Sequence, residues 1–97
     1  MCLSYVFLLL SNVDSANVQF GGNITVGNSL IVTTSGQTEA DFELNYFSLT
    51  AKVFYLQTLG TITVSTSKFN VQNLTLKANS IYLTNVNTAD NLTILRT

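Results

Sequence analysis

The chain has 97 residues, enough for one domain, and only 9% of them are charged: 4 Lys and Arg, 5 Asp and Glu, and no His. Asn, Ser and Thr together make up roughly a third of the chain, and Leu, Val, Ile and Phe make up another third. So much apolar content excludes an intrinsically disordered chain, and a net charge of -1 gives no electrostatic footprint for a nucleic-acid partner.

Residues that carry chemistry are scarce. Without His there is no imidazole base to activate a Ser or Thr nucleophile, and the G-x-S-x-G motif is absent. Cys2 is the single Cys, so an intrachain disulfide is excluded and a His/Cys metal site is implausible. We expect a protein that is not an enzyme and that needs no cofactor.

The first eleven residues, MCLSYVFLLLS, are the most apolar part of the chain. The unbroken apolar run from Tyr5 to Leu10 is far shorter than the ~20 residues that a membrane-spanning helix needs. No Lys or Arg precedes Lys52, so the basic start of a secretory signal is missing, although a signal peptide stays open as an alternative. We expect no transmembrane helix here, but a buried strand or a segment that docks on a partner protein.

A short alternation of apolar, middle and apolar residues dominates the rest of the chain. Period-2 alternation places the two outer residues of such a triplet on one face of a strand and the middle residue on the other. Most middle residues are Thr, Ser, Asn, Gln or Glu, which suit a solvent face. The triplets therefore predict very short strands with one buried face, starting at Val18, Ile24, Leu30, Phe42, Phe47, Phe54, Ile62, Phe69, Leu74, Ile81 and Leu92.

The spacing of these triplets predicts a winding chain. The linkers are too short for crossover helices, and they lack the Asn-Gly and Asp-Gly pairs that favour tight hairpins. An internal repeat supports rungs of similar structure, because NITVGNSLIVT from Asn23 matches NLTLKANSIYLT from Asn73 with one inserted residue. We expect an all-β protein, a β-helix or β-solenoid of short strands with polar corners.

The segment GQTEAD, residues 36–41, interrupts the apolar pattern. We expect it to be a loop or linker between an N-terminal docking segment with short strands, residues 1–35, and a β-helical shaft, residues 42–97. Glu39, Asp41 and Glu43 alternate around its end, so an extended strand would place all three on one face. Such carboxylates form a weak candidate site for Ca²⁺ or for glycoside hydrolysis; a charged strand edge that discourages edge pairing is the simpler interpretation.

Alternation also predicts which side chains face the core. In the shaft, Thr63, Asn70, Thr75 and Tyr82 should point outward. The residues that should point inward are Ile62, Val64, Phe69, Val71, Leu74, Leu76, Ile81 and Leu83.

Oligomerisation follows from the thin core. One chain of this length could form four or five triangular turns of about 20 residues, with two open ends that need capping. Three chains wound together or packed side by side would close the core along a threefold axis instead. We favour such a homotrimeric triangular prism over a single-chain solenoid.

Two stretches resemble known phage proteins. The run from Ile62 to Thr84, ITVSTSKFNVQNLTLKANSIYLT, looks like the β-helical part of phage tail spikes and of the related spikes of type VI secretion systems. The upstream GGNITVGNSLIV is similar to repeats near phage tail-fibre shafts. The resemblance covers residues 18–94, and adhesin solenoids share its pattern.

This resemblance implies a structural part of a virion tail, a rigid trimeric spike pressed against or through the host cell envelope. Some such spikes end in a His-x-His metal-binding tip, which this chain cannot form, and no catalytic residue is carried over. A small spike would need a tail hub or baseplate protein, and Leu3, Tyr5, Phe7 and Leu9 are the candidate attachment residues. Alternatives are another trimeric virion part, such as a fibre shaft or capsid decoration protein, and an extracellular or cell-surface adhesin that acts as a binding module.

Overall fold

The computed structural model describes residues 2–13, 17–34, 39–88 and 91–96. Side chains are described from residue 17 onward within these ranges, except that of Thr88. Every element is a β-strand, and all strand pairs are parallel. The sheet order is β1-β2-β3-β4-β5, and β6 also pairs with β4. The strands are β1 (Cys2–Val13), β2 (Asn17–Thr34), β3 (Asp41–Gln57), β4 (Thr61–Ala78), β5 (Ser80–Thr88) and β6 (Asn91–Arg96).

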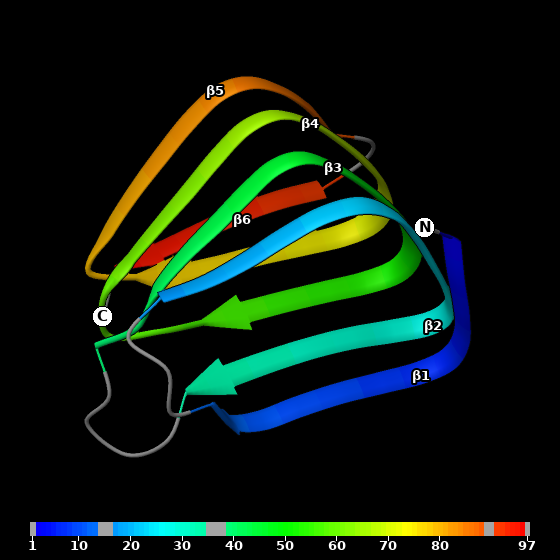
Figure 1. Ribbon diagram of the computed structural model, residues 1–97, viewed down its shortest axis with the longest axis horizontal. Coiled ribbons are helices and arrows are strands. Elements are labelled where there is room, and N and C mark those ends of the chain that lie inside the picture. The colour runs from blue at the N-terminus through cyan, green and yellow to red at the C-terminus, as the bar shows by residue number, and fades with distance from the viewer. Residues whose placement is uncertain (1, 14–16, 35–38, 89–90, 97) are drawn as a thin grey trace.

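The chain forms a β-solenoid of about four turns, which confirms the predicted fold class. Phe42 of β3 pairs with Ile62 of β4, and Ile62 pairs with Ile81 of β5, so one turn is the stretch of chain between two such partners. Figure 1 shows each turn tracing a rounded triangle, with successive strands stacked along the solenoid. Successive strands of this one chain supply the neighbouring turns.

The strands are longer than the predicted triplets. β4 has 18 residues and bends around corners, so that one strand holds several triplets. We divide each turn into three sides, defined by the register with β3 and β4. The first side holds residues 41–45, 61–65 and 80–84; the second holds residues 47–51, 67–71 and 86–88; the third holds residues 53–57, 73–78 and 91–96.

A single residue makes the corner between the first and second sides. Tyr46, Thr66 and Asn85 have φ of 53°, 50° and 51°, the left-handed conformation, in three successive turns. Gly22, with φ of 80°, bends β2 at the matching place. One left-handed residue turns the chain while the ladder continues on both sides, which explains why the triplets merge into long bent strands.

Thr66→Gly is expected to stabilise the protein. A β-branched residue in the left-handed region is strained, and the penalty of about 1–2 kcal/mol exceeds the entropy that glycine loses on folding. We expect the free energy of unfolding in urea to rise by about 0.5–1 kcal/mol. Thr63→Gly, on a straight part of the same strand, should lower it; a loss of stability in Thr66→Gly would contradict this account of the corner.

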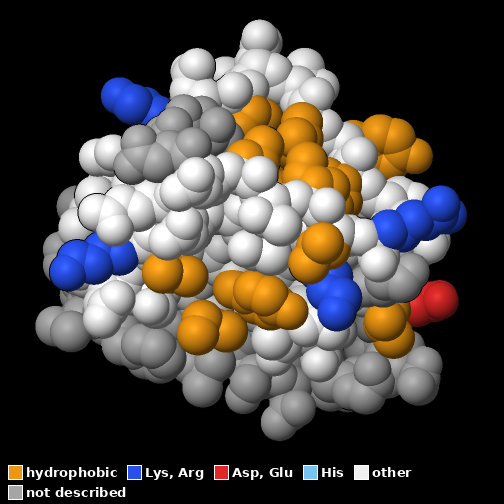
Figure 2. All heavy atoms as spheres, turned by 180° about the vertical axis from the view of Figure 1, so that it is seen from behind, with side chains coloured by type: hydrophobic (Ala, Val, Ile, Leu, Met, Phe, Trp, Pro, Cys, Tyr) orange, Lys and Arg blue, Asp and Glu red, His pale blue; other side chains and the backbone are white. Residues whose placement is uncertain are grey.

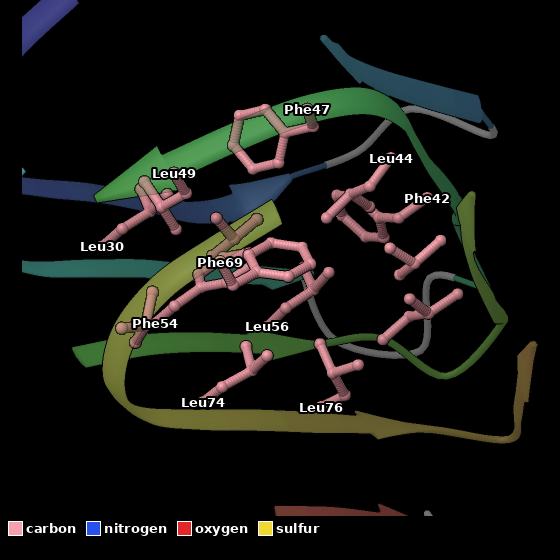
Figure 3. Close-up of a cluster of buried hydrophobic side chains, with 14 of the residues drawn as sticks. Leu30, Phe42, Leu44, Phe47, Leu49, Phe54, Leu56, Phe69, Leu74 and Leu76 are labelled. Atoms are coloured by element: carbon pink, nitrogen blue, oxygen red, sulfur yellow. The ribbon is translucent and has the colours of Figure 1, made fainter. Parts of the chain in front are cut away.

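The core fills the inside of the triangle with alternate residues of each side. Phe47, Phe54 and Phe69 lie within 5.8–6.5 Å of one another, measured between ring centroids, and leucines from neighbouring turns surround them (Figure 3). Of the predicted core residues, six are buried: Ile62, Val64, Phe69, Val71, Leu74 and Leu76. The outward positions Asn70 and Tyr82 are exposed, and Thr63 and Thr75 are partly exposed.

Leu83 lies at an inward position, opposite the buried Val64, but it is not buried. Its side chain is 38% exposed, and Ile81 is only partly buried against the core. Both belong to β5, which pairs with β4 on one side and, among the described residues, has no strand on the other. An inward position is fully buried only when turns cover it from both sides, and alternation within a strand does not reveal which turn is last.

Buried hydroxyls hold two of the corners. Thr58 donates a hydrogen bond from Oγ1 to the Ala40 carbonyl at 2.7 Å and accepts one from the Gly60 N–H at 3.1 Å. Ser67 lies just after the left-handed corner, where its Oγ donates to the Leu44 carbonyl at 2.9 Å and accepts from the Phe47 N–H at 3.3 Å. These hydroxyls satisfy backbone groups that the bend removes from the ladder.

The predicted linker joins two strands that are neighbours in the sheet. Residues 35–38 lie outside the described part of the chain, and Asp41 is the first residue of β3. On either side, β2 pairs with β3 from Asn17 opposite Asp41 to Thr33 opposite Gln57. The predicted docking segment and shaft therefore share one sheet.

Candidate functional site

A groove lies over the left-handed corner, between the first two sides of the triangle. It has a volume of about 620 Å³ and extends over β3, β4 and β5. The left-handed residues Tyr46, Thr66 and Asn85 all line the groove. The corner that positions the groove therefore also orients the side chains of these three residues. Among the large hydrophobic residues whose side chains the structure describes, Tyr46 is the most exposed, with 76% of its surface exposed. The lining residues are Tyr46, Ser48, Thr66, Ser67, Lys68, Asn85, Val86 and Asn87.

These groups can bind a polar ligand. Hydroxyls, two amides and the Lys68 ammonium supply hydrogen bonds, and the exposed ring of Tyr46 offers an aromatic face. The lining contains neither a carboxylate nor an imidazole that could act as a general base. The groove is therefore a candidate for the recognition of a polar ligand.

This groove was not predicted, although the sequence contains a signal for it. The inward residues change parity at the left-handed corner: Phe42 and Leu44 are even-numbered, whereas Phe47 and Leu49 are odd-numbered. A change of phase requires a residue that leaves the pleat, and Tyr46 is that residue. The same change between Val64 and Phe69 marks the corner at Thr66.

The acidic residues do not come together as a metal site. Glu43 accepts a hydrogen bond from the Gln19 amide at 3.0 Å, and Asp41 accepts one from the Thr61 N–H at 3.2 Å. Glu39 is exposed and precedes β3, so it is not part of the strand that carries the other two. Within the described residues no group of three or more Cys, Asp or Glu side chains could hold a metal ion. These carboxylates instead link neighbouring turns on the first side.

The candidate attachment residues lie in β1. Leu3 pairs with Ile24 and Phe7 with Ser29 of β2, which places their backbones in the sheet. The side chains of Leu3, Tyr5, Phe7 and Leu9 are outside what the structure describes. The attachment of this segment to a hub protein therefore stays a prediction.

The surface is weakly charged. Figure 2 shows Lys and Arg side chains standing apart from one another on a face that is largely uncharged, with apolar patches between them. Asn73 and Asn91, the repeated residues at the start of the third side, bond to each other across turns: the Asn91 Nδ2 donates to the Asn73 Oδ1 at 3.2 Å. Polar ladders of this kind add contacts between turns without adding charge.

Comparison of the chain with protein-family models, with curated proteins and with solved structures found no match. In the part of the chain that the structure describes, no helix is long and apolar enough to cross a bilayer.

Proposed function

We propose that this protein is a non-enzymatic structural component of a virion tail, a spike or tail-tip protein whose solenoids pack side by side as a homotrimeric shaft. The observation that carries the proposal is an apolar patch on the outside of an otherwise Thr-, Asn- and Ser-rich solenoid. The patch lies on the third side of the triangle, where Ile31 of β2 and Val53 and Tyr55 of β3 point outward and are partly buried. On the neighbouring β4 the outward residues of this side are Asn73, Thr75 and Lys77, and beyond them Leu95 of β6 is 45% exposed.

The outward direction of these residues follows from the pleat. Phe54 and Leu56 are fully buried, so their neighbours Val53 and Tyr55 face away from the core. Ile31 and Tyr55 are register partners on adjacent turns, so their side chains form a stripe along the solenoid. A threefold axis beside the third side would bury three such stripes against one another.

The proposed role is mechanical. Parallel ladders connect every turn, and the inward columns, such as Phe42–Ile62–Ile81 and Phe54–Leu74–Leu92, run from turn to turn without a break. Close packing of this kind has low compressibility and transmits strain. Such a shaft would carry force from a hub or baseplate protein, held by the β1 segment, to the host cell envelope for attachment and entry.

Tyr55→Lys tests the proposed trimer. A charge in the middle of the apolar stripe would be buried without a partner in the trimer but solvated in the monomer. We expect native mass spectrometry to show trimer association weakened at least ten-fold, with the far-UV circular dichroism unchanged. Asn70→Lys, an exposed outward position on the second side of β4, is the matched control and should keep the wild-type mass. Equal masses for the two variants would contradict this interface.

The groove favours a second candidate function, that of a surface adhesin acting as a binding module. An adhesin would bind a ligand through the exposed Tyr46 and would be found exported, with a processed N-terminus. A panel of cell-surface polysaccharides would test this role: Tyr46→Ala should abolish binding, and Tyr82→Ala, which removes a ring 61% exposed outside the groove, should not. Intact Met1 in protein isolated from virions would contradict the adhesin.

A further inference from the structure

The C-terminal end of the solenoid exposes residues that belong to the core columns. Leu92 and Ile94 pair with Leu74 and Leu76 of β4, which are buried, yet they are 42% and 47% exposed. Leu83 likewise pairs with the buried Val64. The outer edges of β5 and β6 have no partner strand among the described residues. We call the surface formed by β5 and β6 the end rung.

The end rung lies over all three sides of β4. β5 covers the first and second sides of β4, and β6 covers the third. The opposite end has a different outline, because β1 pairs with β2 only from Asn23 onward and leaves the segment from Asn17 to Phe20 without a partner in β1. A second copy of the end rung presents the same three sides as the first.

A two-fold axis through Thr93 makes the end rung complementary to itself. Antiparallel pairing of β6 with its copy then sets Leu92 opposite the partner's Ile94, so that inward residues meet inward residues. The corner at Asn85 joins the first and second sides and so lies opposite the third side of the triangle, where the same axis passes near it. It brings Leu83 of the first side against the second side of the partner.

The charges permit this arrangement. Arg96 is the single charged residue in β5 and β6, whose surface otherwise lacks the Lys residues and prolines that protect free strand edges. Arg96 lies three residues from Thr93, so the two-fold axis separates the two copies of Arg96 by roughly 20 Å. Salt screens charges beyond about 10 Å, so like-charge repulsion does not oppose the contact.

We propose that the end rung binds the end rung of a second copy of this chain, end to end, and closes both cores. The contact continues the stacking that joins β4 to β5 and β6, with antiparallel in place of parallel pairing. It is distinct from the side-by-side trimer, because it uses the free edges of β5 and β6 and not the outward face of the third side.

A disulfide at the axis tests the contact directly. In a Cys2→Ser background, Thr93→Cys should form a covalent dimer under mild oxidation, since Cβ atoms directly opposite in an antiparallel pair lie about 4.5–5.5 Å apart, close to the spacing of a disulfide. Thr75→Cys, in the same column one turn inside the solenoid, is the matched control: it faces outward on the third side as Thr93 does, so it measures any crosslink that side-by-side packing alone produces. Failure of Thr93→Cys to crosslink above this control would overturn the proposal.

Native mass separates this contact from the trimer. Leu92→Lys should halve the mass of the wild-type assembly, from six chains to three if the trimer also forms and from two to one if it does not. Asn70→Lys should leave the mass unchanged. A wild-type mass of three chains that Leu92→Lys does not alter would refute the end-to-end contact and leave the trimer standing. Should Leu92→Lys fail to fold, the crosslink alone decides.

Discussion

Replacing Phe47 by alanine is expected to remove about 3–5 kcal/mol from the free energy of unfolding, the range for truncating a large buried aromatic residue. Phe47 is fully buried beside the left-handed corner. Its ring centroid lies 5.6 Å from that of Phe20, 5.9 Å from that of Phe69 and 6.5 Å from that of Phe54, so one ring joins β2, β3 and β4. The loss is comparable to the total stability of many small domains, about 5–15 kcal/mol.

Urea unfolding followed by far-UV circular dichroism measures this loss. Tyr82→Ala is the control, because it removes a ring of similar size that is 61% exposed, and it should change the stability by less than about 0.5 kcal/mol. A loss below about 1 kcal/mol in Phe47→Ala would show that the site collapses around the missing ring, contrary to a close-packed column of turns.

Gly60→Ala is expected to destabilise the protein by about 2–3 kcal/mol. A Cβ added at Gly60 would overlap the Ala40 carbonyl oxygen and would lie 2.9 Å from the carbonyl carbons of Ala40 and Glu39. These are backbone atoms, so they cannot rotate away as a side chain could. Ala40 is fully buried, and its carbonyl also accepts the Thr58 hydrogen bond, so movement there would disturb the corner.

Gly21→Ala is the matched control for Gly60→Ala. Its Cβ would meet the Asn45 carbonyl oxygen at 3.4 Å, an ordinary contact. The urea midpoint of Gly21→Ala should therefore stay near that of the wild type, while that of Gly60→Ala falls. Similar midpoints for the two variants would mean that the corner at Gly60 is not as tightly closed as the structure has it.

The alternation of apolar and polar residues predicts much of the fold. Inward residues such as Val64 and Leu76 are buried, and Asn70 faces solvent, because side chains on a strand alternate whatever the tertiary contacts. The linkers predict winding because they are too short for crossover helices and lack hairpin turn pairs. If each side of a triangular turn holds one or two triplets, the length of a turn follows from the spacing of the triplets.

Features that depend on contacts between turns could not be predicted in this way. The exposure of Leu83 depends on β5 being the last described turn, which no local pattern encodes. The hydrogen bond between Glu43 and Gln19 joins residues 24 apart in sequence, a contact between turns that alternation within one strand does not encode. The groove at Tyr46 arises only when three corners stack.

The mass of Leu92→Lys in native mass spectrometry tests the central proposal, a trimeric shaft, most directly. This variant removes the end-to-end contact but leaves the outward face of Ile31, Val53 and Tyr55 intact. We predict an assembly with three times the mass of the 10.6 kDa chain. A folded species of 10.6 kDa, with the circular dichroism of the wild type, would contradict the side-by-side trimer and with it the proposed tail spike.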